Sequence, residues 1–248
     1  MNRRMTIIAL AALCALALSA IAASGASAGT TAYTCVVAPG VGSHFSDEDC
    51  KNIDNVTPGK FGHVAIASNQ KTTTKTVSTG FWSLFGKLFG ANVELSATGV
   101  ECVGCSGENK EVGGVMEVTG TGGKLRFTGV KVVGAESVCT VVGSATGTIT
   151  TQPLKFTTTL VTGVTLEPVT GTLLAEFNIT GGSCPVSGTG IKATGRARVT
   201  LAGAKLTFNV TKASEELKLE GEKATLKGEG TAEAGSGATH HPVSLTTV

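Results

Sequence analysis

The chain has 248 residues, of which 41% are hydrophobic, 15% are charged and 34 are glycine, with a formal net charge of +2. Soluble domains usually carry about 25% charged residues and about 7% glycine, so this chain is poor in charge and rich in glycine. Disorder of the whole chain is excluded because it requires low hydrophobicity and high net charge. Collagen is excluded because the glycines follow no three-residue period.

The first 28 residues have the order of a secretory signal peptide. Arg3 and Arg4 form a positive segment, residues 7–23 form an apolar run, and residues 26–28 read Ala-Ser-Ala, a typical cleavage site. A retained transmembrane anchor is the less favoured alternative, because about 17 residues rich in alanine are marginal for spanning a bilayer. We therefore predict a secreted, extracellular protein that is not an integral membrane protein.

Removal of this leader would also remove the net charge. The whole chain carries 20 basic and 18 acidic residues. Loss of Arg3 and Arg4 makes the two kinds equal in number. A nucleic-acid-binding protein needs a basic patch, and the sequence contains no long basic run. We therefore expect no nucleic-acid partner, whereas a cell-surface or protein partner stays open.

Along the chain, short segments with apolar residues at every second position predict half-buried antiparallel strands. Gly, Asn or Ser bounds each segment, and turn signals recur about every ten residues, which favours a β-sandwich or a partly closed barrel. We expect a signal peptide, a cysteine-bracketed segment packed on the main domain, and one antiparallel β domain, at residues 1–28, 29–60 and 61–248. The clearest strands are predicted at residues 61–67, 93–102, 124–132, 205–211 and 216–220.

The N-terminal segment contains all three aspartates of the chain, Asp47, Asp49 and Asp54. Calcium binding in an EF-hand loop needs an oxygen ligand at the fifth position and glycine at the sixth. Counted from Asp47, these positions hold lysine and asparagine. We therefore favour a capped helical turn with Ser46 as the N-cap and acidic residues in the first turn.

Residues 81–90 (FWSLFGKLFG) break the alternating pattern. Phe81, Leu84, Phe85 and Leu88 lie at helical spacing, which predicts a short amphipathic helix. This helix would either plug one end of the β core or form a binding surface. The candidate interaction residues are Phe81, Trp82, Phe85 and Phe89.

Six cysteines follow the leader: Cys35, Cys50, Cys102, Cys105, Cys139 and Cys184. In an exported chain they predict three disulfides, although the sequence does not fix their connectivity. Cys35 with Cys50 would staple a short loop, and Cys139 with Cys184 could join two strands across the core.

Cys102 and Cys105 form a C-x-x-C motif, which also occurs in zinc and redox sites. In an extended chain their Cα atoms would lie about 10 Å apart, beyond disulfide reach. They can therefore pair only if Gly104 turns the chain. Redox use would need a βαβ context and zinc usually needs a second such pair, so we favour a structural disulfide. We predict no metal ion and no cofactor.

Towards the C-terminus, the chain from Thr211 is rich in lysine and glutamate. We expect a solvated edge strand there, because charges protect sheet edges. A loose loop over residues 228–239 and a closing strand from Pro242 are expected to follow.

The sequence contains few motifs that indicate catalysis. No G-x-S-x-G elbow occurs, His63 lies in a predicted strand, His44 lies beside the acidic turn, and residues 240–241 (His-His) lie in the predicted loop region. A glycosidase needs two converging carboxylates. Sequence can only name possible pairs, such as Glu94 with Glu117 and Glu167 with Glu176. We therefore assign no catalytic residue.

Several short motifs give the chain a wider resemblance. They are residues 45–47 ahead of Cys50, together with residues 62–66, 113–116, 127–130 and 149–154. On these motifs the chain resembles uncharacterised secreted Thr/Gly-rich all-β proteins of high-GC Gram-positive bacteria. The resemblance implies export from a bacterial cell and carries over no catalytic residue.

Three hypotheses about function remain. The first is a secreted, non-catalytic structural or interaction protein. The second is a carrier of a small apolar ligand, with residues 81–90 as a lid over a barrel mouth. The third is a secreted hydrolase that uses a glutamate pair.

Overall fold

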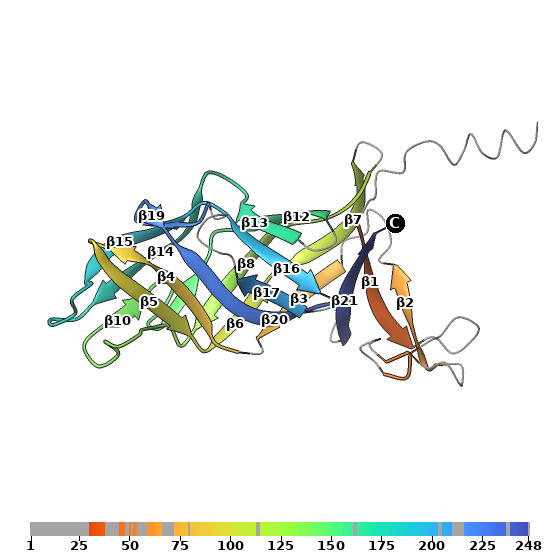
Figure 1. Ribbon diagram of the computed structural model, residues 1–248, viewed down its shortest axis with the longest axis horizontal. Coiled ribbons are helices and arrows are strands. Elements are labelled where there is room, and N and C mark those ends of the chain that lie inside the picture. Colours follow the sequence, from red (N-terminus) through yellow and green to blue (C-terminus); the bar gives the residue numbers. More distant parts are fainter. Residues whose placement is uncertain are drawn as a thin grey trace, which may run out of the picture.

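The protein is described from a computed structural model, which covers residues 30–37, 45–47, 50, 52–53, 59–65, 72–78, 80–112, 115–160, 163–202, 205–209, 216–236 and 239–247. The predicted signal peptide, His44, Asp49 and Asp54 lie outside the described residues. Every regular element in the described part is a β-strand, and all strand pairs are antiparallel (Figure 1). The all-β fold class is therefore confirmed.

Sixteen of the described strands belong to one large sheet. They are β1 (Thr30–Val37), β2 (Phe61–Ala65), β3 (Thr72–Ser78), β4 (Trp82–Leu88), β5 (Ala91–Ala97), β6 (Gly99–Val103), β7 (Ser106–Val112), β8 (Val115–Thr128), β9 (Lys131–Val132), β11 (Thr148–Thr150), β12 (Leu154–Leu160), β13 (Gly163–Pro168), β16 (Ala197–Ala202), β17 (Lys205–Asn209), β20 (Thr225–Ser236) and β21 (Thr239–Thr247).

Eight strands of the large sheet close into a ring of hydrogen-bonded neighbours. Their order is β17-β16-β13-β12-β8-β7-β3-β20, and β20 pairs with β17 to complete the ring. The link between β3 and β7 is the shortest one, with Thr72 opposite Gly107 and Thr73 opposite Ser106. The large sheet is therefore a partly closed barrel.

A smaller five-stranded sheet lies towards the left-hand end of Figure 1, on the side of β4 and β5. Its order is β10-β14-β15-β18-β19. The strands are β10 (Thr140–Val142), β14 (Leu173–Thr180), β15 (Gly188–Thr194), β18 (Lys218–Leu219) and β19 (Glu222–Lys223). β1, β2 and β21 lie at the opposite end of the molecule.

The hydrophobic core forms one cluster to which both sheets contribute. Leu88 and Leu219 are completely buried, and Trp82 and Ile179 are 1% exposed. The rings of Trp82 and Phe127 meet edge to face, with centroids 5.9 Å apart, a geometry that favours aromatic pairs. Both sheets therefore share one core.

The predicted helix over residues 81–90 is wrong, because this segment forms β4 and a turn. β4 is hydrogen-bonded on both sides, to β5 and to β20. Trp82 and Leu88 are buried, and residues six positions apart share one face of a strand, whereas in a helix they would point about 120° apart. An isolated helix of this length with two glycines would be marginal, so cross-strand pairing and burial decide the structure.

β4 and β5 form a tight hairpin whose two turn residues are Phe89 and Gly90. Leu88 pairs with Ala91, and both turn residues have positive φ, 54° for Phe89 and 85° for Gly90. This is the pattern of a type I′ turn, whose twist matches that of the flanking strands. The turn lies at the left-hand end of the molecule in Figure 1.

The predicted loop over residues 228–239 is wrong as well, because β20 occupies most of it. β20 pairs with β4, β17, β3 and β21 along its length. Gly228 allows Trp82 to lie against the strand, since a Cβ atom at this glycine would come 2.9 Å from Trp82 Cγ. The closing strand is confirmed as β21, and the two histidines at 240–241 lie in it, not in a loop.

Other predicted strands differ from the observed ones at their boundaries. The segment at 93–102 is divided between β5 and β6, because Thr98 lies between them. The segment at 124–132 contains the end of β8 and then β9. β1, from the predicted N-terminal segment, pairs with both β2 and β21.

All six predicted cysteines form disulfides, in the three pairs Cys35–Cys50, Cys102–Cys105 and Cys139–Cys184. Gly104 has a φ of 66° and turns the chain, which brings the Cα atoms of Cys102 and Cys105 to 5.7 Å. Cys139 directly precedes β10 and Cys184 follows β14, and these two strands pair. The last disulfide therefore links the ends of neighbouring strands in one sheet instead of crossing the core.

Candidate functional site

The four predicted interaction residues do not form one surface. Phe81 and Phe89 are 78% and 68% exposed, whereas Trp82 is buried in the core. Phe85 is half-buried, and the Lys227 ammonium lies 4.8 Å from the centre of its ring. Phe81 and Phe89 flank β4 at its two ends, about 25 Å apart at the rise of an extended strand. The structure thus leaves two separate exposed aromatic side chains.

Phe89 has an unusual environment for an exposed side chain. Its backbone is in the left-handed region, which bulky residues rarely adopt. One edge of its ring lies over Gly188, where an added Cβ atom would come 2.7 Å from Phe89 Cζ. The remainder of the ring faces outward. Phe89 therefore projects from the tip of the β4–β5 hairpin at the left-hand end of the molecule.

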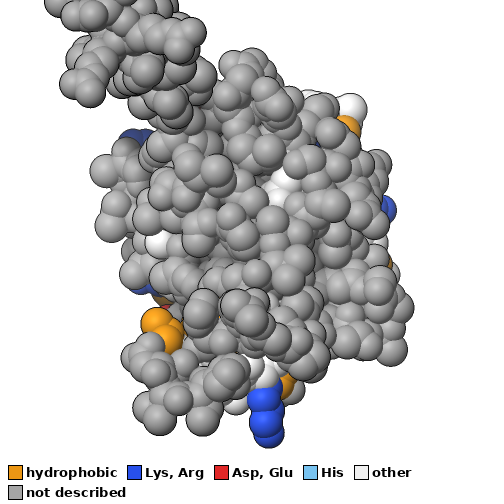
Figure 2. Space-filling view, turned by 90° about the vertical axis from the view of Figure 1, so that its right-hand side faces the viewer, with side chains coloured by type: hydrophobic (Ala, Val, Ile, Leu, Met, Phe, Trp, Pro, Cys, Tyr) orange, Lys and Arg blue, Asp and Glu red, His pale blue; other side chains and the backbone are white. Residues whose placement is uncertain are grey.

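Figure 2 shows the right-hand end of the molecule, where the few described side chains that are visible are mostly isolated hydrophobic and basic groups. Among the described residues, the most exposed large hydrophobic side chains are those of Phe81, Phe89 and Ile53.

Two of the glutamates proposed as catalytic pairs have other side-chain partners. Glu94 accepts a hydrogen bond of 2.8 Å from the Ser83 hydroxyl. Glu167 forms an ion pair of 3.1 Å with Lys155, and Glu176 lies opposite Lys192 across the β14–β15 pair. The side chain of the fourth, at position 117, is not among those described.

The predicted acidic turn is partly described. The Asn52 N–H donates a 2.6 Å hydrogen bond to Asp47 Oδ2, and Ser46 Oγ donates to the Asn52 carbonyl. Asp47 thus accepts the backbone N–H of Asn52 in this turn, whereas the residues that a Ser46 N-cap would bind lie outside the described ranges. In the part of the chain that the structure describes, no three His, Cys, Asp or Glu side chains could together hold a metal ion.

The histidine side chains are not among those that the structure describes. His63 is part of β2, opposite Cys35 of β1, and its side chain is not described.

Within the described ranges, no helix is long and apolar enough to cross a membrane.

Glu136 shows the clearest electrostatic effect. Its own backbone N–H and that of Gly134 lower the pKa of this carboxyl below its usual value, with Lys131 adding to the effect. The Gly134 N–H donates to Glu136 Oε1 at 3.0 Å. The residue is fully exposed in the turn after β9, so the hydrogen bonds hold a turn in place and do not prepare an acid for catalysis.

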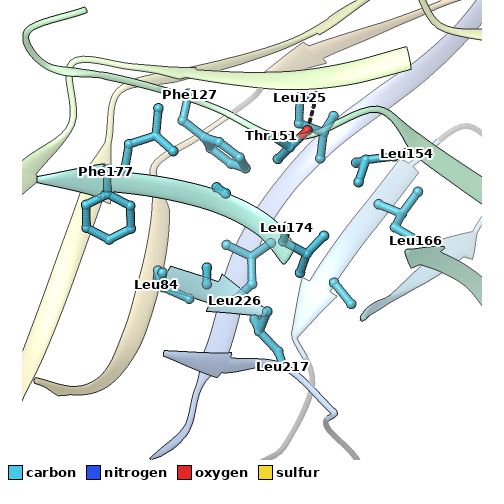
Figure 3. A pocket seen from close by; sticks show the side chains of 14 residues that line it. Leu84, Leu125, Phe127, Thr151, Leu154, Leu166, Leu174, Phe177, Leu217 and Leu226 are labelled. Atoms are coloured by element: carbon cyan, nitrogen blue, oxygen red, sulfur yellow. Dashed lines mark hydrogen bonds between the residues drawn. The ribbon is translucent and has the colours of Figure 1, made fainter. Parts of the chain in front are cut away.

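An apolar cavity of about 80 Å³ lies between the two sheets (Figure 3). Leucine and phenylalanine side chains from β4, β8, β12, β13, β14 and β20 surround it. Thr151 is the one lining residue with a polar side chain, and its Oγ1 accepts a 3.0 Å hydrogen bond from the Leu125 N–H. A second, smaller space of about 30 Å³ borders Cys102 and Cys105. Neither space has an acidic side chain in its lining.

Comparison with protein-family models, with curated proteins and with solved structures finds no match for this chain. The functional interpretation therefore rests on the side chains described above.

The carrier hypothesis allowed for an apolar cavity, but sequence reasoning did not identify the strands that line it and missed the position of Phe89 at a hairpin tip. The dipeptide Phe89-Gly90 between two alternating segments was a turn signal, since glycine is preferred at the second position of a type I′ turn. Nothing comparable pointed to the cavity. Its lining comes from strands far apart in the sequence, and packing of the two sheets brings these residues together.

Proposed function

We propose that the protein is an exported, non-catalytic interaction protein of bacterial origin that contacts a cell-surface or protein partner through Phe89. The disulfides support export, because such bonds form and persist in oxidising environments outside the cytoplasm. The signal-peptide pattern of the sequence supports it independently.

Phe89 is the observation that carries the proposal. A bulky residue at positive φ costs of the order of 1–3 kcal/mol, and asparagine or aspartate is preferred at this turn position. Phenylalanine is therefore a poor choice for the turn itself. With 68% of its surface exposed, it also gains little from burial in this chain. Aromatic side chains are common anchors of protein interfaces, and binding would explain why this residue stands here.

The test is the substitution Phe89→Asn. Asparagine suits a type I′ turn, so we expect the free energy of unfolding to rise by about 1 kcal/mol. Binding of the labelled protein to cells of the producing organism, measured by co-sedimentation, should fall at least tenfold. Stability and binding thus change in opposite directions, which a misfolded variant cannot imitate.

Phe81→Asn is the matched control, because Phe81 is also an exposed phenylalanine but lies at the other end of β4. It should bind as the unaltered protein does. If Phe89→Asn binds unchanged, or if it lowers the stability, Phe89 has a structural role and the proposal is wrong.

A further inference from the structure

We infer that the cavity between the two sheets is a binding site for a small, uncharged molecule of hydrocarbon character. This goes beyond contact with a partner through Phe89, because it assigns the protein a ligand in its interior. The site lies where the smaller sheet covers the partly closed barrel, and the mouths of β-barrels are common ligand sites.

The first step is the chemistry of the lining. Thirteen of the fourteen lining residues are apolar. The exception, Thr151, is buried and already accepts the Leu125 N–H. A water molecule in a cavity needs two to four polar partners, and apolar cavities of this kind stay dry. A charged ligand would lose its hydration without gaining a partner.

The second step is the reason that the space exists. Ala175 and Ala193 lie opposite each other in the β14–β15 pair, and both line the cavity together with Ala197 of β16. The register of β14 shifts between Leu173 and Ala175. This bulge turns two consecutive side chains, Leu174 and Ala175, towards the cavity. Small side chains at these positions leave room that larger ones would fill.

The third step is size. A volume of about 80 Å³ is about half that of an engineered dry cavity of roughly 150 Å³ that takes up benzene or xenon. The space is partly open to the exterior. It therefore suits either a free apolar molecule of a few heavy atoms or the end of an alkyl chain that enters from outside.

The test uses xenon, which has no polar group, and ¹³C-methyl NMR of the full disulfide-bonded protein. Xenon should give saturable shifts of the methyl signals of Leu84, Leu174 and Ile149, which line the cavity. Methyl signals of Leu219 and Val141, which are buried but do not line it, should not move. Absence of saturable shifts, or equal shifts in both groups, would overturn the inference.

Ala193→Val fills the site and should reduce xenon affinity at least tenfold, without lowering the melting temperature. Ala97→Val is the matched control, because Ala97 is buried in a strand but does not line the cavity. It should lower the melting temperature and leave xenon binding unchanged. Ala197→Val is a second filling variant should Ala193→Val not fold. Undiminished xenon binding in the filling variants would overturn the inference.

The uncharged probe 1-octanol then distinguishes the two sources of ligand. Saturable shifts of the same methyl signals, lost in Ala193→Val, identify the end of an alkyl chain as the occupant. Xenon binding without 1-octanol binding identifies a free small molecule. Failure of xenon to bind leaves the role of Phe89 untouched, because Phe89 does not line the cavity.

Discussion

The three disulfides close loops of very different length, so their removal should destabilise the protein in a defined order. In the chain-entropy model, a disulfide stabilises by lowering the entropy of the unfolded chain, more for a longer loop. The sequence separations are 45 for Cys139–Cys184, 15 for Cys35–Cys50 and 3 for Cys102–Cys105. These separations correspond to about 4.0, about 3.0 and about 1.6 kcal/mol at 25 °C.

Each disulfide is removed in turn by replacing both of its cysteines with alanine. Alanine avoids placing an unpaired hydroxyl in the buried positions. Cys139, Cys184, Cys35 and Cys50 are each at most 7% exposed, so the packing lost is similar for these two pairs. The difference of about 1 kcal/mol between them therefore reports loop closure.

Urea unfolding gives the free energy of unfolding of each variant from the midpoint and the slope. The free energy is compared, not the midpoint, because a chain with one disulfide fewer exposes more surface on unfolding and has a steeper slope. In the presence of a strong reductant, the unaltered protein and all variants should converge. Equal losses for the three pairs, or the largest loss for Cys102–Cys105, would refute the reasoning.

Two further predictions concern a glycine and a carboxyl group. Gly228→Ala should destabilise the protein by about 1–3 kcal/mol in urea unfolding, because the added methyl group overlaps the indole packed on β20. Gly182→Ala, where nothing lies within 4 Å of the new Cβ atom, should have no such effect, and equal effects would contradict the packing. The carboxyl of Glu136 should titrate below the usual glutamate pKa of about 4.3 in ¹³C NMR. The ionised Glu136 carboxylate then stabilises the fold fully above the pKa of the unfolded chain, and this stabilisation is lost as the pH falls through the lower pKa of the folded protein. An NMR titration midpoint at or above the usual glutamate pKa would contradict this prediction.

Full reduction should have a larger effect than any single replacement. Together the three disulfides correspond to about 9 kcal/mol, which is comparable to the total stability of about 5–15 kcal/mol of most proteins. We therefore expect the reduced protein to be largely unfolded.

The fold class and the disulfide role of the six cysteines could be predicted from the sequence, because each depends on a local pattern or on a small number of residues. The connectivity of the disulfides could not be fixed in this way. Alternating segments at 61–67 and 205–211 became β2 and β17. The turn at Gly104, which the C-x-x-C pairing requires, has the expected positive φ.

The segment at 81–90 was predicted wrongly because its apolar residues fit two periods at once. Leu84 and Leu88, four residues apart, satisfy both the helical spacing and the alternation of a strand. What decides between them is the pairing of β4 with β20, more than 130 positions further along the chain. Long-range pairing of this kind leaves no signal in a short window of sequence.

β20 was missed for a related reason. Its glycine, alanine and glutamate residues have low strand propensity, so composition favours a loop. Four neighbouring strands supply its backbone hydrogen bonds, and Gly228 makes room for Trp82. The cavity likewise depends on how two sheets meet, which the residues of one strand do not reveal.

The position of β20 in the chain has a consequence for the order of folding. Three of its four partners, β3, β4 and β17, precede it in the sequence, and β3 is separated from it by about 150 residues. The ring of strands cannot close until this late segment arrives. A chain that emerges N-terminus first must therefore keep the earlier strand edges unpaired for a time, which slows folding and exposes them to aggregation. Among the described strands of the ring, β20 is thus the one whose arrival allows the ring to close.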